Sequence, residues 1–137
     1  MTFFYEDVLL ALQDGGVRFV LVGGTAVILH GVPRTTADLD IVIDLEESNV
    51  RRLIEAMTRL GFRPRAPIPA ADLATPERRR EWIEEKGMRA FTFQRPGRLL
   101  DEVDIIIDAP LTFAELRGEA RVLEAEGLRL PVASPRH

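Results

Sequence analysis

The sequence has no cysteine, and only one of its 18 basic residues, Lys86, is a lysine. Without cysteine the chain forms no disulfide and offers no thiolate to a metal, which excludes zinc sites of the cysteine type. No apolar run approaches the roughly 20 residues that a membrane-spanning helix needs. Residues 1–7 lack the basic start of a signal peptide, so we expect a cytoplasmic protein with no membrane partner.

The chain also has no surplus of positive charge, since acidic residues outnumber basic ones and the net charge is -4. Non-specific nucleic-acid binding depends on neutralising phosphates, so a broadly basic nucleic-acid platform is excluded. A local basic patch stays open: the run Arg78-Arg79-Arg80 could face RNA, although such a run is usually a solvated helix face. With 137 residues the chain is long enough for one core, and we expect a single domain over residues 1–137.

The hydrophobic pattern predicts helices and strands in alternation. Apolar residues at helical spacing predict helices over residues 5–13, 25–30, 46–60, 77–86 and 113–116. Branched apolar runs predict strands over 17–22, 39–43, 88–94 and 99–107, and a hairpin across 126–127. Residues 64–76, rich in proline and alanine, predict a loop or lid-like insertion. This order indicates an α/β or α+β protein with a mixed sheet flanked by helices.

Helix-end signals accompany two of these predictions. Asp44 and Glu47 form a plausible capping box for the helix over 46–60. Thr75 is expected to cap the helix over 77–86, with Pro76 at its first position. Within that helix Trp82 and Ile83 are expected to anchor it to the core.

Carboxylates are concentrated on two of the predicted strands. Asp38 and Asp40 are two residues apart at the start of a strand, so their side chains point to the same face. Two such carboxylates repel each other unless a cation lies between them, and their hard oxygens suit Mg²⁺ or Mn²⁺. The third ligand should come from an adjacent strand, where Asp104 is the candidate and Glu102 on the same face is an alternative.

A glycine turn precedes the carboxylates. Gly23 and Gly24 have no Cβ, so a triphosphate can approach their backbone closely. The helix expected after them offers free N–H groups at Thr25. Thr36 in the following loop could donate a hydroxyl hydrogen bond, as could Thr35, and Arg34 could clamp a phosphate with two bonds.

These residues resemble a known signature. Val22-Gly23-Gly24, thirteen further residues and then Asp38-Leu39-Asp40-Ile41 resemble the nucleotidyltransferase superfamily, and Val103-Asp104-Ile105 is similar to its later single-carboxylate strand. The segment over residues 23–40 is similar to small bacterial nucleotidyltransferases related to AbiEii-type toxins. The resemblance covers residues 17–60 most strongly and continues to about 133.

The resemblance implies a minimal nucleotidyltransferase fold and Mg²⁺-dependent transfer of an NMP from an NTP to a hydroxyl of a protein or RNA acceptor. It further implies that Asp38 and Asp40 bind both metals, and that Asp104 binds the catalytic metal and helps to activate the acceptor hydroxyl. A toxin–antitoxin setting follows from the resemblance as well. The alternative is a non-catalytic nucleotide-binding or antitoxin-like module with the same fold.

Longer relatives continue into C-terminal helices, which this sequence is expected to lack. We therefore expect the last hairpin, ending near Val132 and Ala133, to leave apolar surface for a homo-oligomer or a small partner protein.

Overall fold

A computed structural model describes residues 5–22, 39–96, 101–125 and 127–133 of the chain. The helix expected over 25–30 lies outside these ranges. Within them the helices are α1 (Glu6–Asp14), α2 (Glu47–Arg59), α3 (Pro76–Lys86), α4 (Phe113–Glu119) and the 3₁₀ helix η2 (Ala70–Ala74). The strands are β1 (Phe19–Val22), β2 (Leu39–Ile43), β3 (Arg63–Pro64), β4 (Ala90–Arg95), β5 (Asp101–Ile106), β6 (Arg121–Ala125) and β7 (Leu128–Val132).

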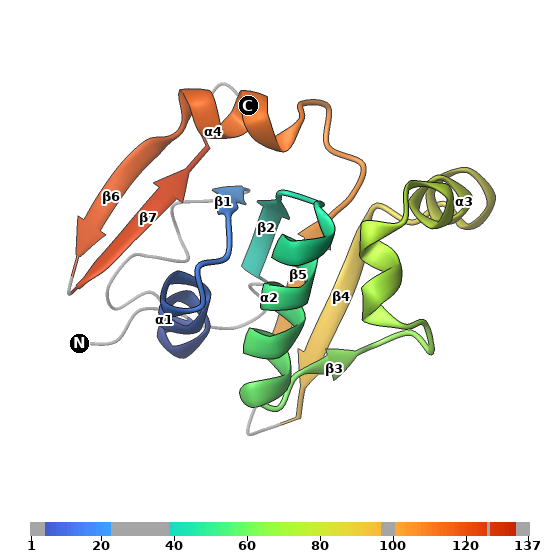
Figure 1. The fold of residues 1–137 in the computed structure, drawn as a ribbon, viewed down its shortest axis with the longest axis horizontal. Coiled ribbons are helices and arrows are strands. Elements are labelled where there is room, and N and C mark those ends of the chain that lie inside the picture. Colours follow the sequence, from blue (N-terminus) through green and yellow to red (C-terminus); the bar gives the residue numbers. More distant parts are fainter. Residues whose placement is uncertain (1–4, 23–38, 97–100, 126, 134–137) are drawn as a thin grey trace.

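The strands form one sheet in the order β3-β4-β5-β2-β1-β7-β6 (Figure 1). β2 runs parallel to β5 and β1 parallel to β7, whereas the remaining neighbours are antiparallel. The sheet is therefore mixed, and the predicted α/β class with a mixed sheet is confirmed. The central position of β2, next to both β1 and β5, brings the expected carboxylate strands together.

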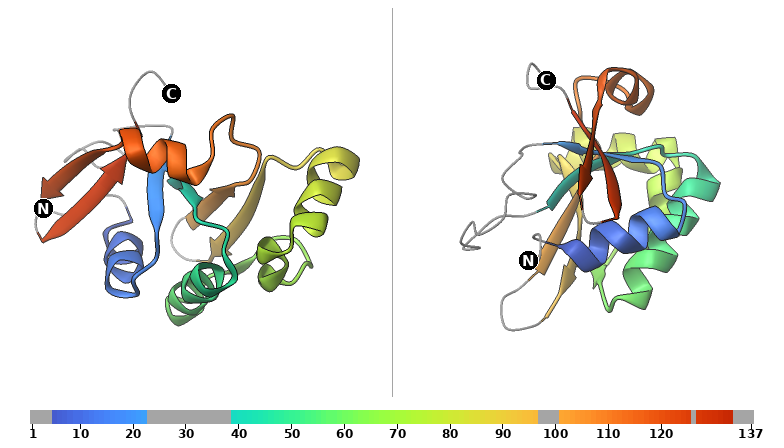
Figure 2. Two further views of the ribbon diagram at one scale, coloured as in Figure 1. Left: turned by 45° about the horizontal axis from the view of Figure 1, so that its top comes forward. Right: turned by 90° about the vertical axis from the view of Figure 1, so that its left-hand side faces the viewer.

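The two faces of the sheet carry different cores. Side chains alternate between faces along a strand, so Leu21 and Ile41 pack toward one side and Val20 and Val42 toward the other. The larger core includes the buried faces of α1 and α2, and the smaller one includes Leu116 of α4. Figure 2 shows this arrangement, with α1 and α2 on one side of β1 and β2 and α4 on the other.

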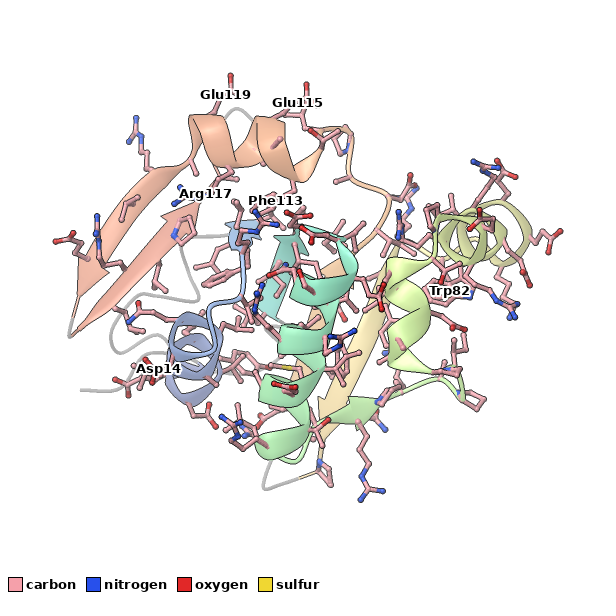
Figure 3. All side chains as sticks on the ribbon, viewed as in Figure 1. Asp14, Trp82, Phe113, Glu115, Arg117 and Glu119 are labelled. Carbon is pink, nitrogen blue, oxygen red and sulfur yellow. The ribbon has the colours of Figure 1, made fainter. Side chains whose placement is uncertain are left out.

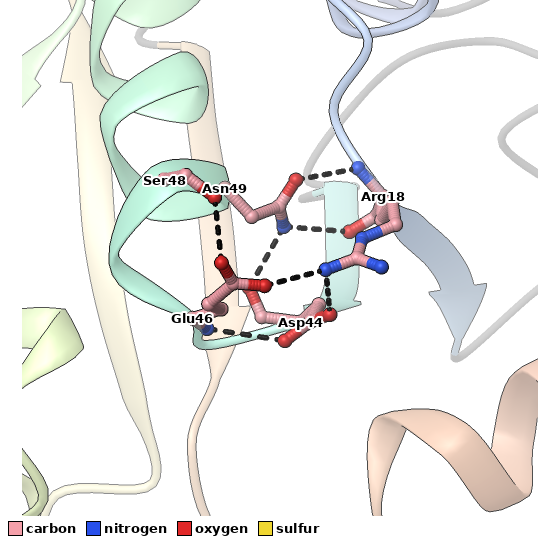
Figure 4. A network of polar contacts seen from close by, with 5 residues as sticks. All are labelled: Arg18, Asp44, Glu46, Ser48 and Asn49. Atoms are coloured by element: carbon pink, nitrogen blue, oxygen red, sulfur yellow. Dashed lines mark hydrogen bonds and ion pairs between the residues drawn. The ribbon is translucent and has the colours of Figure 1, made fainter.

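Asn49 holds β1, β2 and α2 together at one end of the sheet (Figure 4). Its side chain is fully buried, accepts a hydrogen bond from the Arg18 N–H (2.8 Å), and donates to the carbonyls of Arg18 (3.0 Å) and Asp44 (2.7 Å). The Arg18 guanidinium also forms ion pairs with Asp44 and Glu46. A buried amide with all these partners fixes the distance between the strand ends and the helix start.

The capping box expected at Asp44 and Glu47 is wrong. The N-cap of α2 is Glu46, whose side chain forms no capping hydrogen bond. Asp44 instead accepts from the Glu46 N–H (3.1 Å) and pairs with Arg18, a residue 26 positions earlier in the chain. A charged partner brought by tertiary folding therefore decides the role of this carboxylate.

The stretch over residues 64–76 is more ordered than the loop that its composition predicts. It contains the end of β3, which pairs with β4, and η2, whose Leu73 is fully buried. α3 then begins at Pro76 with Thr75 as N-cap, as expected, but the Thr75 side chain forms no capping hydrogen bond. Its carbonyl accepts from the N–H groups of Arg78 and Arg79 (both 3.1 Å).

Trp82 anchors α3, as predicted, because only 2% of it is exposed. Its ring centre lies 5.5 Å from that of Phe91 on β4, and Phe91 lies 5.4 Å from Phe93. Figure 3 labels Trp82 on the α3 side of the molecule. None of the helices in the described ranges has the length and apolar character to cross a bilayer.

Candidate functional site

Two of the predicted carboxylates lie side by side on neighbouring strands. Asp40 on β2 is directly opposite Asp104 on the parallel strand β5. Side chains at paired positions project from the same face of a sheet, and neighbouring strands are about 4.8 Å apart. Both residues are half-buried. The central strands thus bring together two acidic side chains that are 64 positions apart in the sequence.

The row of paired residues continues on both sides of this acidic pair. Val22, the last residue of β1, is opposite Asp40, and Thr92 on β4 is opposite Asp104. The Thr92 hydroxyl donates a hydrogen bond of 2.6 Å to Asp104 Oδ1. Thr92 is only 8% exposed, so this contact is largely screened from water.

Sequence reasoning missed Thr92. Its only signal was a hydroxyl residue at an alternate position of a predicted strand, and many strands contain such a threonine. Its pairing with Asp104 depends on the register of the β4–β5 hairpin, which the sequence alone did not determine.

Glu102, the alternative third ligand, shares this face with Asp104 but has a different neighbour. Its carboxylate forms an ion pair of 2.8 Å with Arg65, which follows β3. The side chain of Glu102 is 19% exposed and that of Arg65 is 60% exposed. A cation of the chain therefore already offsets part of the charge of Glu102, whereas Asp104 accepts from the uncharged Thr92 hydroxyl.

The β4–β5 hairpin that carries Thr92 and Asp104 is closed by Arg95. The Arg95 guanidinium bonds Asp101 and Asp7 (2.7 Å each), and it lies 4.5 Å above the ring centre of Phe62. Burial opposes its charge, but the hydrogen bonds to Asp7 and Asp101 outweigh burial and raise the pKa of Arg95. Asp101 thus belongs to the hairpin end, where it pairs with Arg95.

The other predicted site residues lie outside the described part of the chain. They are Gly23, Gly24, Thr25, Arg34, Thr36 and Asp38. The described part of β1 ends at Val22, directly opposite Asp40. The structure therefore brings together Asp40 and Asp104, and adds Thr92 to them.

The donor chemistry of this pair fits a hard divalent cation. Asp40 and Asp104 offer carboxylate oxygens from paired positions of one sheet face, and Mg²⁺ typically takes one or two protein carboxylates and completes its shell with water and phosphate. In the ranges that the structure covers, no three acidic, histidine or cysteine side chains come together as a metal site. The described residues therefore offer two carboxylates for such a cation, and Asp38 remains the candidate for a third.

A groove of about 410 Å³ lies elsewhere, between α2 and the η2–α3 segment. Its lining includes Val50 and Ile54 of α2 and Ala71 and Ala74 of η2. α2 packs on the face of the sheet opposite to the acidic pair, because Val50 belongs to the larger core together with Ile41. The groove is therefore not part of the carboxylate site.

Comparison with protein families identifies a match over most of the chain. Residues 7–136 match the family described as "Nucleotidyl transferase AbiEii toxin, Type IV TA system". No individual curated protein matches the chain. The match extends over nearly the whole sequence and includes both strands of the acidic pair, as well as the segment with the glycine turn. The chain therefore belongs to the AbiEii family of nucleotidyl transferase toxins, which act in type IV toxin–antitoxin systems.

Proposed function

We propose that this protein transfers an NMP from an NTP to a hydroxyl group of a protein or RNA acceptor, and that the transfer depends on Mg²⁺ or Mn²⁺. The observation that carries the proposal is the pairing of Asp40 with Asp104 on adjacent parallel strands. Membership of a nucleotidyl transferase family supports the reaction class. The metal, the acceptor and the individual site residues are the parts that we propose.

Asp38, Asp40 and Asp104 would hold the divalent cation. When bound, such a cation polarises the transferred phosphate and makes an acceptor hydroxyl easier to deprotonate. A carboxylate has two oxygens, so Asp104 can hold Thr92 through Oδ1 and still offer Oδ2 to a cation or to the acceptor hydroxyl. The half-buried setting of the pair strengthens its electrostatic interactions relative to those in open water.

The glycine segment would bind the triphosphate. Gly23 and Gly24 have no Cβ to obstruct a phosphate, and the Thr25 and Thr36 hydroxyls can donate to its oxygens. Arg34 can form two parallel hydrogen bonds to one phosphate. These roles rest on residue chemistry and on the resemblance of this segment to the superfamily signature.

The test is a labelling assay. The purified chain is incubated with Mg²⁺ and each α-labelled NTP in turn, with tRNA or total cell protein as acceptor. We expect one NTP to label one acceptor class, and we expect Asp40→Asn and Asp104→Asn to lower labelling by about 10³-fold or more, because removing the charged ligands removes the metal-assisted step.

Asp108→Asn is the matched control, because this exposed carboxylate follows the same strand as Asp104 but lies outside the acidic pair. It should keep wild-type labelling. Labelling that survives Asp104→Asn unchanged would show that the assigned site is wrong. Metal-dependent nucleotide binding without any labelling would favour the binding module instead of the enzyme.

A further inference from the structure

One face of β5 carries two carboxylates whose neighbours differ in kind. Glu102 and Asp104 are two residues apart and project from the same face of the sheet. Arg65 engages Glu102 with an ion pair of 2.8 Å, whereas Thr92 engages Asp104 with a hydroxyl hydrogen bond of 2.6 Å. Each acidic side chain is thus engaged by one residue from the adjoining β3–β4 part of the sheet.

These two contacts have opposite consequences for cation binding. An ion pair with a guanidinium offsets part of the charge of its carboxylate, so Glu102 attracts a second cation less strongly than a carboxylate without such a partner. A hydroxyl donates one hydrogen bond and leaves the negative charge in place. Asp104 is therefore oriented without being neutralised.

The geometry of the Thr92 contact suits an orienting role. A length of 2.6 Å lies in the range of hydroxyl–carboxylate bonds that are assisted by charge. Thr92 is 8% exposed, so water has little access to take its place. As a β-branched residue in a strand, threonine has few side-chain rotamers, and its hydroxyl is correspondingly well fixed.

We infer that Thr92 is a positioning residue, which holds Asp104 Oδ1 so that Oδ2 is presented to the divalent cation beside Asp40. The inference rests on the proposed function, because it assumes that Asp104 is a metal ligand. Residues that orient a metal ligand in this way typically change metal affinity by about 10- to 100-fold when they are replaced.

The test measures binding of Mn²⁺ alone to the full chain by electron paramagnetic resonance of the free ion. Thr92→Val keeps the shape of the side chain and removes the hydroxyl, and we expect its Mn²⁺ affinity to fall by about 10-fold or more. Thr92→Ser and Thr92→Ala differ only in the hydroxyl, so the serine variant should bind Mn²⁺ about 10-fold more tightly than the alanine variant. This pair keeps the inference testable if the valine variant does not fold.

Two controls accompany the series. Thr58→Val makes the same change on the exposed side of α2 and should leave the affinity unaltered. Asp104→Asn tests the assumed ligand itself and should weaken binding at least as much as Thr92→Val. Circular dichroism of each variant verifies that the sheet is intact before binding is compared.

The outcomes separate the two proposals. If Asp104→Asn weakens Mn²⁺ binding while Thr92→Val and Thr92→Ala bind as wild type, the positioning role is overturned and the proposed function stands. If Asp104→Asn binds Mn²⁺ as wild type does, the assigned metal site fails and the role of Thr92 fails with it. If Thr92→Ala and Thr92→Ser lose the same Mn²⁺ affinity, the cause is packing of the threonine methyl group and not the hydroxyl. That result likewise overturns the inference.

Discussion

Asn49 offers the sharpest test of how the sheet is held in place. Its side chain is fully buried and makes three hydrogen bonds to the backbone of Arg18 and Asp44. In an Asn49→Ala variant the Arg18 N–H and the Asp44 carbonyl lose this partner. The Arg18 carbonyl keeps a second hydrogen bond, because it also accepts from the Asp44 N–H (3.2 Å).

The magnitude follows from these two groups. A buried backbone group left without a partner costs about 1–3 kcal/mol, so two such groups cost about 2–6 kcal/mol. Water that reaches Arg18 replaces part of the lost hydrogen bonding, so we expect the variant to lose about 2–4 kcal/mol, the lower half of that range. The Arg18 side chain is 52% exposed, so some solvent does reach this end of β1. A domain of this size is typically stable by about 5–15 kcal/mol, so the loss is a substantial fraction of the total.

Urea denaturation at neutral pH measures this loss. With an m-value of about 2 kcal/mol per molar urea, in the middle of the usual range, the midpoint should fall by roughly 1–2 M while the slope stays constant. Ser48→Ala is the control, because the Ser48 hydroxyl donates to the exposed Glu46 carboxylate (2.9 Å), and removing this solvent-accessible bond should cost less than about 0.5 kcal/mol. An Asn49→Ala midpoint equal to that of Ser48→Ala would refute the reasoning.

The remaining predictions concern α4, α3, the acidic pair and assembly. Thr112 accepts from the Glu115 N–H and the Glu115 carboxylate accepts from the Thr112 N–H, so Thr112→Ala should cost about 1 kcal/mol in the same urea assay. The hydrogen bond from the Thr112 backbone lowers the pKa of Glu115 most, and the bond with the Thr112 side chain lowers it further. Figure 3 shows Glu115 on the outer side of α4. The stability that Glu115 adds over Glu115→Gln is therefore complete above the ordinary glutamate pKa of about 4.3 and should vanish as the pH falls through the lowered folded-state pKa. Trp82→Ala should cost about 3–5 kcal/mol, because it removes the buried ring that joins α3 to β4, and thermal unfolding measures it. Asp104→Asn removes a charge next to Asp40, so the melting temperature without metal should stay level or rise, and a clear fall would contradict repulsion within the pair. Val122 is 42% exposed on β6, which is the edge strand at one end of the described sheet. An edge strand can pair with a second chain, so we expect light scattering to show a homo-oligomer and the Val122→Lys variant to shift toward monomer. A clean monomer at high concentration would remove this assembly proposal.

Local sequence patterns determined the strongest elements of the fold. β2 spans Leu39–Ile43 as predicted, because its branched apolar run is flanked by polar residues. α2 follows the apolar stripe that includes Val50, Leu53 and Met57, and it differs from the predicted range by one residue at each end. α1 ends at Asp14, with Gly15 as C-cap and Gly16 at a φ of 69°, a backbone conformation that glycine adopts readily.

Elements with weak local patterns were decided by their partners. β3 is two residues long and exists through its pairing with β4, and η2 follows it in a stretch whose prolines predicted a loop. The same holds for Asp44, where Arg18 supplies a charge that no local helix-start pattern reveals. The alternation along β5 put Glu102 and Asp104 on one face, yet it could not distinguish between them.

For the candidate site, the sequence determined the chemical types and their spacing, and the resemblance suggested how they work together. The glycine turn and Asp38 stay predictions. Only the tertiary structure decided that Asp40 is opposite Asp104, that Thr92 binds Asp104 and that Arg65 binds Glu102. Strand register is set by contacts between residues far apart in the chain, because each strand's pattern repeats every two residues and fits several alignments equally well until its neighbours are in place.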